Sequence, residues 1–372
     1  MKFNCKVSDL ASAVAAATRV VPNRPTHPIL ANVLIRAREG KLYVTGYDLS
    51  LSLTPVCLAE VEEPGEITLP AKTLNDLISK LPPSETARFS VKELNVTIEL
   101  SFGSYKIQGI SSESYPELAS FADESKGFEI ESEVLNQALS FCVVATSREE
   151  TKQVLCGVNI QSTGSCLKFA ATDGHRLVKT TFDLNVADEL NVTLPSRSVS
   201  ELIKILAVTH SSATEVTFSP THAEFFTGNT TLITRNLTGQ YPAYEQLIPN
   251  QHEHKIEIGD RAEFLSAVQR VGVLSGELIK LRASKNYLKI ISRGSDQGAG
   301  EETITASANL EEGVDIAFNT KYLTDALKSI QSDAIIINFN KSKLNEVSTP
   351  IIFTPSGDRN DIYLLMPVTL KN

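Results

Sequence analysis

The sequence predicts an α+β protein made of three repeated domains, each with two helices packed on antiparallel sheets. Three observations support this fold class. The chain repeats itself about every 125 residues, each repeat holds two segments with helical spacing of apolar residues, and strand-like segments alternate between them. A chain of 372 residues with 42% hydrophobic and 21% charged residues has enough apolar material for two or three cores.

The clearest repeated segment is led by proline or asparagine and occurs at residues 69–78, 194–203 and 318–327. Pro70 and Pro195 are 125 positions apart, and Asn319 follows 124 positions later. A second helix-like segment and a Tyr-Pro pair recur with similar spacing. Several matches with one period predict three homologous domains. Polar stretches place their boundaries near residues 126 and 253, which gives domains of 1–126, 127–253 and 254–372.

Each repeat has the same predicted order of elements. A short strand comes first and an amphipathic helix follows, with Ser8, Ser132 and Asp260 as expected N-caps. Alternating strands come next, such as residues 32–37 and 41–45 around a Glu-Gly turn. The second helix is expected to begin at the repeated proline, because proline is favourable at the first helical position. Further strands close the repeat.

The cysteines predict free thiols. Cys5, Cys57, Cys142, Cys156 and Cys166 are scattered, odd in number and without a Cys-x-x-Cys pair. That pattern is typical of reduced thiols in the cytoplasm and not of a metal site or a disulfide framework. The chain also has no run of ~18 apolar residues that would span a membrane. We therefore expect a cytoplasmic protein without a metal ion or another cofactor.

Residues 172–176 are the stretch most similar to an active site, because Asp173 and His175 place a carboxylate near an imidazole. A turn after the strand at residues 167–171 explains the Asp-Gly pair equally well. No nucleophile motif of the Gly-x-Ser-x-Gly type accompanies the pair. We expect no catalysis. A hydrolase or nuclease that uses these two residues is the alternative, and activity without any added partner would distinguish it.

The charge pattern differs between the helices and the rest of the chain. The net charge of −9 and the pI of about 5.3 argue against a simple nucleic-acid binder. Yet Lys72, Arg197 and Lys321 occupy the same position in the second helix of each repeat. A cation in the first helical turn costs roughly 0.3–1 kcal/mol against the helix dipole, so its repetition indicates attraction of a ligand. A solvated face inherited through duplication is the open alternative. The six expected helical segments hold ten basic and seven acidic residues.

Four motifs carry a resemblance to a known family. They are Arg-Pro-Thr-His-Pro-Ile-Leu at 24–30, Ala-Thr-Asp-Gly-His-Arg-Leu at 171–177, Tyr-Pro-Ala-Tyr at 241–244 and Leu-Met-Pro-Val-Thr-Leu at 365–370. With these motifs, the threefold repeat and the length, the whole chain resembles the β subunit of bacterial DNA polymerase III, the β sliding clamps. The resemblance implies a head-to-tail homodimer ring whose helices line a central hole around duplex DNA, with no catalysis.

The resemblance also implies site residues. Sequence-independent DNA contact falls on Arg24, Lys72, Arg148, Lys152, Arg197 and Lys321. The polymerase catalytic subunit, the clamp loader, other polymerases and repair proteins would insert short hydrophobic peptides into a pocket formed by Leu155, Thr172, Gly174, His175, Arg176, Leu177, Pro242, Leu247, Asn319, Tyr322, Ser348, Pro350, Leu364, Met366, Pro367 and Val368. We expect Thr172, His175 and Arg176 to stand as polar groups at the rim of an apolar floor.

The dimer interface implied by the resemblance joins Tyr105 and Ile107 of one chain to Val273 and Leu274 of the other. Gln246 and Thr369 stand where many relatives have arginine, and residues 371–372 extend the chain, so the preferred peptide motif stays open. A repeat scaffold unrelated to DNA is the second alternative. Retention on circular but not linear duplex would exclude that scaffold.

Overall fold

The computed structural model describes residues 1–119, 121, 126–186, 189–292, 298–340, 349–357 and 360–368. The chain forms two compact units, Met1–Asn136 with Glu201–Asn236, and Gln137–Ser200 with Leu237–Asn372. The division passes through the middle repeat, because the strands of that repeat belong to two different sheets. Among the described residues, no helix combines the length and apolar character that a membrane span requires.

The first unit contains a five-stranded and an eight-stranded sheet, both antiparallel. The smaller sheet has the order β5 (Glu60–Glu63), β1 (Lys2–Lys6), β7 (Thr86–Lys92), β8 (Asn95–Leu100) and β9 (Gly103–Gln108). The larger sheet has the order β10 (Lys126–Glu131), β15 (Ala213–Phe218), β16 (His222–Thr227), β17 (Thr230–Arg235), β4 (Leu51–Leu58), β3 (Lys41–Tyr47), β2 (Asn32–Arg38) and β6 (Gly65–Pro70).

The core of the first repeat lies between these sheets and the helices α1 (Val7–Thr18) and α2 (Ala71–Ile78). The two helices contact each other, and their apolar residues Leu10 and Leu74 are fully buried in this core. The rings of Phe3 and Phe89 stack with their centroids 4.7 Å apart. The repeat is thus held by burial of helical faces against strands, the usual source of stability in a two-layer domain.

The second unit contains a nine-stranded and a four-stranded antiparallel sheet. The larger sheet has the order β14 (Leu190–Pro195), β11 (Gly157–Ser162), β12 (Leu167–Thr172), β13 (Arg176–Phe182), β26 (Ile362–Leu365), β25 (Ile351–Pro355), β24 (Ile335–Phe339), β18 (His254–Ile258) and β22 (Ser307–Ala308). The smaller has the order β21 (Glu301–Thr305), β20 (Tyr287–Ser292), β19 (Leu278–Ser284) and β23 (Val314–Asn319).

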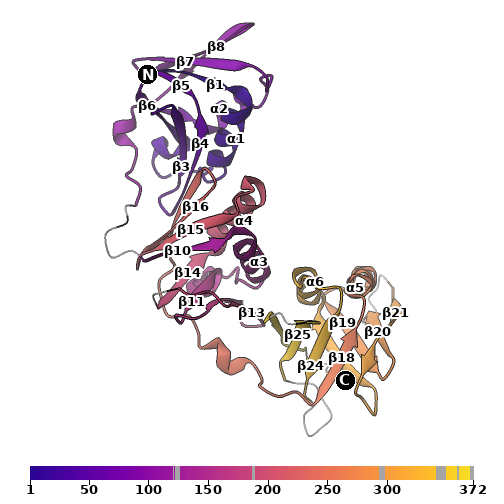
Figure 1. Cartoon of the computed structure of the whole chain (residues 1–372). Helices are drawn as coiled ribbons and strands as arrows, with labels where there is room; N and C mark the ends of the chain where they lie inside the picture. Colours follow the sequence, from indigo (N-terminus) through magenta and orange to yellow (C-terminus); the bar gives the residue numbers. More distant parts are fainter. Residues whose placement is uncertain are drawn as a thin grey trace. The chain divides into compact units, whose positions relative to one another are not determined.

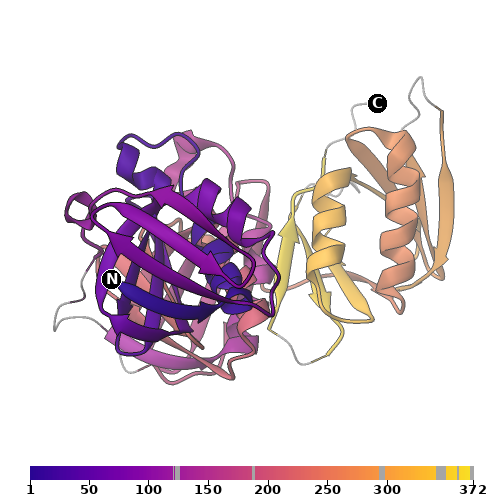
Figure 2. The ribbon, with the colours of Figure 1, turned by 90° about the horizontal axis from the view of Figure 1, so that it is seen from above.

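The last repeat carries two helices, α5 (Arg261–Ser275) and α6 (Thr320–Ser329), which lie side by side over its strands (Figures 1 and 2). The middle repeat has α3 (Ser132–Val143) and α4 (Ser196–Thr209) in the equivalent places in the chain. Short 3-10 helices lie at η1 (Pro28–Ala31), η2 (Ser112–Ser114), η3 (Glu150–Cys156) and η4 (Tyr244–Leu247). Each repeat therefore has the predicted order of strand, helix, strands, helix and strands, and the α+β fold class is confirmed.

Equivalent strands join the repeats. The last strand of the middle repeat, β17, pairs with β4 of the first, and the last strand of the last repeat, β26, pairs with β13 of the middle. The outermost strand β9 of the five-stranded sheet and the outermost strand β21 of the four-stranded sheet occupy the corresponding places at the two ends of the series. Among the described strands, β9 and β21 are thus the equivalent pair of edge strands that do not pair with each other within this chain.

The start of the second helix differs from the prediction. Pro70 and Pro195 are the last residues of β6 and β14, and the helices begin one residue later, at Ala71 and Ser196. Both prolines belong to the strand ladder, where Pro70 lies opposite Asn32 and Pro195 opposite Gly157. The prediction that these prolines occupy the first helical position is wrong, because strand pairing continues up to them.

The first helix of each repeat was predicted with mixed success. Asp260 caps α5 as expected, since its carboxylate accepts the N–H of Glu263 at 2.8 Å. Ser132 begins α3. Ser8, in contrast, lies inside α1, which begins at Val7, and its hydroxyl donates to Asp9 at 2.9 Å. Ser8 as an N-cap is therefore wrong, because the strand β1 continues directly into the helix at Val7.

Candidate functional site

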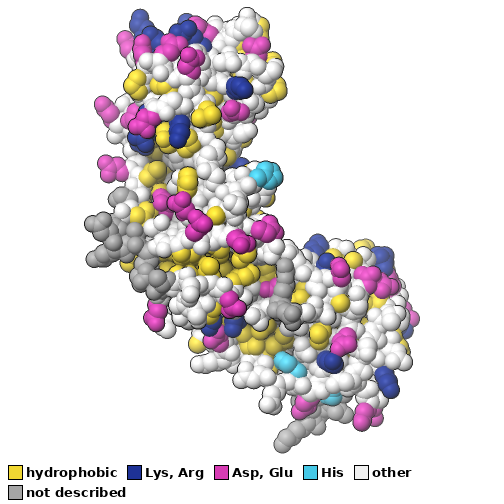
Figure 3. Space-filling model, viewed as in Figure 1, with side chains coloured by type: hydrophobic (Ala, Val, Ile, Leu, Met, Phe, Trp, Pro, Cys, Tyr) yellow, Lys and Arg dark blue, Asp and Glu magenta, His cyan; other side chains and the backbone are white. Residues whose placement is uncertain are grey.

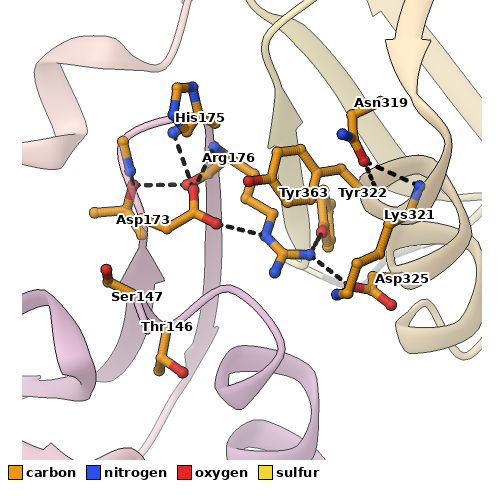
Figure 4. A network of polar contacts seen from close by, with 12 residues as sticks. Thr146, Ser147, Asp173, His175, Arg176, Asn319, Lys321, Tyr322, Asp325 and Tyr363 are labelled. Atoms are coloured by element: carbon orange, nitrogen blue, oxygen red, sulfur yellow. Dashed lines mark hydrogen bonds and ion pairs between the residues drawn. The ribbon is translucent and has the colours of Figure 1, made fainter. Parts of the chain in front are cut away.

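The turn between β12 and β13 is built around Asp173. One carboxylate oxygen, Oδ1, accepts the N–H groups of His175 at 3.0 Å and Arg176 at 3.1 Å, and Oδ2 accepts Nε of Arg176 at 3.0 Å (Figure 4). Gly174 has φ +93°, a conformation that side chains other than glycine rarely adopt. The carboxylate holds the turn and the guanidinium, so its hydrogen bonds serve the structure of this loop.

Arg176 connects this turn to the last repeat. Its side chain is only 5% exposed, its Nη1 is 2.8 Å from Oδ2 of Asp325 and 3.2 Å from the hydroxyl of Tyr363, and its guanidinium lies 4.4 Å above the ring of Tyr322 (Figure 4). Burial alone would lower the pKa of Arg176, but Tyr363 and the hydrogen bond to Asp325 raise it overall. Because Nε and Nη1 both donate to carboxylates, the buried charge is compensated by two acidic partners.

The first turn of α6 forms the opposite side of the site. The side-chain oxygen of Asn319 accepts the N–H groups of Lys321 at 3.0 Å and Tyr322 at 3.2 Å, which caps the helix. Nζ of Lys321 lies 2.6 Å from Oδ2 of Asp325, one turn further along. The ring of Tyr322 stacks on the imidazole of His175, with centroids 6.2 Å apart. The cap therefore sets Tyr322 against the β12–β13 turn.

The C-terminal segment after β26 is tied to both of these elements. The N–H of Met366 donates to the carbonyl of His175 at 3.0 Å, and the N–H of Val368 donates to the carbonyl of Ala317 at 2.8 Å. The side chain of Met366 is 37% exposed, and Pro367 and Val368 are half-buried. The segment thus presents an apolar side chain at the surface beside His175.

An apolar group lies on the other side of the turn. Leu177 and Leu364 pack with Ala170, Tyr241 and Tyr244 in a buried cluster, with Val154, Leu155 and Ile248 partly buried at its edge. The hydroxyl of Tyr241 accepts the N–H of Thr172 at 3.0 Å. Burial raises the pKa of Tyr241 well above its usual range, so the phenol stays neutral. Leu247 is 57% exposed and Pro242 is exposed, so this cluster borders open surface.

An open cleft of about 800 Å³ lies between η3, the β12–β13 turn and the start of α6. His175, Arg176 and Tyr322, which the sequence assigned to peptide binding, line it. Arg148 and Lys321, which it assigned to DNA contact, line the same cleft. Within the second unit, the two sets of predicted residues therefore meet in one place.

Two residues of the predicted pocket rim are buried. Thr172 is 7% exposed, and its hydroxyl donates to the carbonyl of Arg176 at 2.6 Å, while Arg176 itself is 5% exposed. The prediction that both stand at the rim is wrong. The hydroxyl of Thr172 forms hydrogen bonds within the turn, and the guanidinium of Arg176 donates to the carboxylates of Asp173 and Asp325. Of the three expected rim groups, His175 is exposed. Pro350 is half-buried just before β25, and Ser348 and Thr369 lie outside the described residues.

The predicted DNA-contact residues are all at the surface but differ in their partners. Arg24, Lys72, Arg148 and Arg197 are exposed. Lys152 is exposed as well, but it forms an ion pair with Glu149 at 2.9 Å. The observed helices hold seven basic and six acidic residues, so their excess of basic residues is smaller than expected. The residues that drop out are Arg19, Lys80 and Arg148, which follow helix ends, and Asp260, which precedes α5.

The surface around β1, β5 and β7 shows no surplus of either sign on the face in view. Basic and acidic side chains are intermixed there (Figure 3). Lys2 pairs with Glu63 at 2.6 Å and Arg88 pairs with Glu62 at 2.9 Å. These exposed pairs offset one another, so this part of the molecule is not a basic surface.

The predicted interface residues lie in different units of one chain. In the first unit, Ile107 of β9 is buried and Tyr105 packs beside it, both against the core of their own repeat. In the second, Val273 on α5 is 75% exposed and Leu274 is half-buried. Because the predicted contact joins two copies of the chain, it stays a prediction.

Several residues that hold the site are not among the predicted pocket residues. Asp173, named from the sequence only as half of a possible catalytic pair, holds Arg176 together with Asp325 and Tyr363, and Tyr241 and Tyr244 belong to the apolar cluster. The motif at residues 241–244 contained a signal for the tyrosines, because its Tyr-Pro pair recurs in the first repeat. Tyr363 had no such signal. No group of three or more potential metal ligands is found in the part of the chain that the structure describes.

Comparison with known proteins gives one consistent family. Models of the DNA polymerase III beta subunit match three parts of the chain: the N-terminal domain at residues 1–119, the central domain at 129–243 and the C-terminal domain at 245–369. The beta sliding clamps of Synechocystis sp. and Synechococcus elongatus are 36% and 35% identical, each over the full length of both chains.

A solved structure agrees with these matches. The sliding clamp of Bartonella birtlesii, described as bound to griselimycin, superposes with a TM-score of 0.92 at 28% identity and covers all of both chains. The three domain models together span nearly the whole sequence. The chain therefore belongs to the family of the DNA polymerase III beta subunit, the β sliding clamps.

Proposed function

We propose that two copies of this chain close head to tail into a ring around duplex DNA, and that each copy holds replication proteins through a peptide site beside His175. As a member of its family, the chain is a DNA sliding clamp, a processivity factor and a non-catalytic accessory subunit of DNA polymerase III. The proposal concerns how this chain assembles, where DNA passes and where partners bind.

The edges of the sheets carry the proposal for the ring. Inside the chain, β17 pairs with β4 and β26 pairs with β13. By the same pattern, β9 of one copy would pair with β21 of another copy. A sheet edge left uncovered invites uncontrolled pairing, and head-to-tail contacts form a closed ring when their rotations complete a full turn. The exposed Val273 on α5 belongs to the same repeat as β21 and would be buried by this contact.

DNA passage is supported by exposed cations on loops and on the second helix of each repeat. Arg24 and Arg148 lie in loops and Lys152 lies in η3, while Lys72, Arg197 and Lys321 recur at one position of α2, α4 and α6. In the proposed ring these helices line the hole. Phosphate attraction without base contacts suits a protein that must slide.

Partner binding is supported by the apolar cluster of Leu177, Leu364 and the partly buried Leu155, which borders the exposed Met366 and Leu247. An apolar floor with a few polar groups at its edge is the usual composition of a ligand site. That a relative of the same fold is solved with griselimycin supports a ligand site on this fold. The polymerase, the clamp loader and repair proteins would compete for this one site per chain.

The domain boundaries at residues 126 and 253 stay part of the proposal, as does location in the cytoplasm. Two measurements test the ring. The mass in solution should be twice 40.5 kDa. The protein, once loaded, should stay on circular duplex and dissociate when that duplex is cut. A monomeric mass, or equal retention on linear DNA, would contradict the ring.

A further inference from the structure

Two of the five free cysteines meet in the core of the first repeat. Cys5 and Cys57 are 52 positions apart in the sequence, yet their Sγ atoms lie 3.9 Å apart. Cys5 is 2% exposed and Cys57 is 9% exposed. Their spacing in the sequence did not predict the contact, because cysteines so far apart meet only through the tertiary fold.

The path of the chain explains why these thiols meet. Cys5 lies on β1 of the five-stranded sheet, and Cys57 lies on β4 of the eight-stranded sheet. The chain passes from β4 to β5 immediately after Cys57, and β5 then pairs with β1, with Val61 opposite Phe3 and Glu60 opposite Asn4. This crossover between the two sheets carries Cys57 beside Cys5, so the contact belongs to the folded repeat.

We propose that Cys5 and Cys57 are an oxidation site, at which a peroxide converts the two thiols of the folded protein into a reversible disulfide. A disulfide needs its sulfur atoms about 2.0 Å apart, so the observed separation must close by about 1.9 Å. In the proposed reaction, rotation of the two side chains about their Cα–Cβ bonds brings the sulfur atoms together.

The reaction balances with hydrogen peroxide as the oxidant. The sulfur of Cys57, as thiolate, attacks one peroxide oxygen, the O–O bond breaks, and hydroxide leaves and takes up a proton to become water. Cys57 is then a sulfenic acid. The sulfur of Cys5 attacks the sulfur of Cys57, the S–S bond forms, the S–O bond breaks, and the second oxygen leaves as water. Two thiols lose two electrons in total, and the peroxide gains them.

The contacts of the pair support this order of events. The two sulfur atoms are within hydrogen-bonding distance of each other, and this contact lowers the pKa of Cys57 and raises the pKa of Cys5. Cys57 is also the more exposed of the two, so a small oxidant reaches it first. Burial raises the pKa of Cys142 well above its usual range, so that thiol is a matched unreactive control.

The bond would join the two sheets of the first repeat. The sheet of Cys57 continues through β4 into the middle repeat, and the sheet of Cys5 ends at β9. A cross-link between residues 5 and 57 closes a long loop and restricts the unfolded chain. The oxidised protein should therefore unfold at a higher temperature than the reduced protein.

The experiment uses the full-length reduced protein, treated with hydrogen peroxide in its native state. The reaction is stopped, the chain is unfolded, free thiols are alkylated, and the intact mass and the peptide map are recorded. We expect a loss of two hydrogen atoms and protection of Cys5 and Cys57 from alkylation, both reversed by dithiothreitol. Full alkylation of both residues after peroxide treatment would overturn the proposal, and so would a sulfinic acid on Cys57 beside a free Cys5.

Two variants separate this site from general oxidation. Cys57→Ala should lose the cross-link and the rise in melting temperature, whereas Cys142→Ala should keep both. A cross-link that persists in Cys57→Ala would show that other thiols form it. The peptide map of the wild-type protein decides the question on its own if either variant fails to fold.

Discussion

The guanidinium of Arg176 and the carboxylate of Asp325 form an ion pair, with Nη1 2.8 Å from Oδ2, that joins the middle repeat to the last. The joint between the first and middle repeats has a related pair, Nε of Arg19 and Oε2 of Glu201, at 2.7 Å. Glu201 and Asp325 occupy the same position in the second helix of their repeats. At both joints, the acidic residue at this helix position therefore forms an ion pair with an arginine of the preceding repeat.

Replacing Asp325 by asparagine should weaken the joint between β13 and α6. The guanidinium of Arg176 is 5% exposed and would lose one of its two carboxylate partners while it keeps Asp173. We expect a loss of roughly 1–3 kcal/mol in the free energy of unfolding, because a buried charge is left partly compensated. Urea unfolding of the full-length protein measures it.

The control for this variant is Asp76→Asn, which changes the exposed acid at the equivalent position of α2. It should change the stability of the chain by less than about 0.5 kcal/mol, the usual effect of a surface substitution. Equal losses of unfolding free energy in Asp325→Asn and Asp76→Asn would show that the ion pair with Arg176 does not stabilise the joint.

The pH dependence of stability should carry the signature of Asp325. Burial raises the pKa of this carboxyl, but the hydrogen bonds from Lys321 and Arg176 lower it more, so the pKa lies below its usual value. A depressed pKa in the folded state contributes stability that is complete above the unfolded value of about 3.9 and is lost as the pH falls through the folded value.

The difference in stability between the wild type and Asp325→Asn should therefore be constant from pH 7 to about 5 and shrink below about pH 4. Urea titrations across this range test it. A difference that already changes between pH 7 and about 6 would point to a histidine and not to the carboxyl.

The repeat and the fold class were predictable because duplication repeats the same apolar spacing and the same residue matches three times. The contacts that hold the site were not. Arg176 was assigned to a pocket rim from its place in a motif, whereas its burial depends on Asp325, 149 positions away. The basic position before that acid, Lys321, was interpreted as a ligand contact, yet it forms an ion pair with Asp325 at 2.6 Å. The pairing of Arg176 with Asp325 depends on the tertiary fold, which no local pattern reveals, whereas the i,i+4 spacing of Lys321 and Asp325 within α6 is visible in the sequence.

Ring assembly should depend on the end of α5. Replacing Val273 and Leu274 with glutamate places two charges where the proposed contact with β9 of a second copy would bury them. We expect soluble chains with the monomer mass of 40.5 kDa, measured by light scattering. Val208→Glu is the matched control, because Val208 is 69% exposed but lies on α4 of the middle repeat, which carries neither proposed edge, and it should remain dimeric. A dimeric mass for the double variant would show that the interface lies elsewhere on the chain.

DNA affinity should fall when the cations Arg24, Arg148 and Lys152 are removed, and Arg148 should matter more than Lys152. Lys152 is already paired with Glu149 at 2.9 Å, so binding of its ammonium group to a phosphate must displace that carboxylate. Neutralising Arg24, Arg148 and Lys152 together should reduce the slope of log affinity against log salt by about one for each phosphate that no longer has a cation beside it. Fluorescence anisotropy with duplex at several salt concentrations measures the slope. An unchanged slope would show that these three residues do not contact DNA phosphates. A strong preference for one base sequence would contradict sliding.

Peptide binding should depend on the C-terminal segment. Met366 presents an adaptable apolar side chain beside His175, while its N–H holds the carbonyl of that residue at 3.0 Å. Met366→Ala keeps this main-chain bond and removes the side chain, so it should weaken a polymerase-derived peptide by about 1–2 kcal/mol. Deletion of residues 366–372 also removes the bonds to His175 and Ala317 and should abolish binding while the dimer persists.

Calorimetry with one peptide compares these variants with Leu58→Ala, which truncates a 72% exposed leucine in the other unit and should bind as the wild type does. Because β13 and β26 remain paired up to Leu365, the truncated protein keeps the strands that position Leu177 and Leu364. Loss of affinity in it can then be assigned to the segment and not to unfolding, provided that its melting temperature is unchanged. Wild-type affinity in the truncated protein would place the docking site elsewhere on the chain.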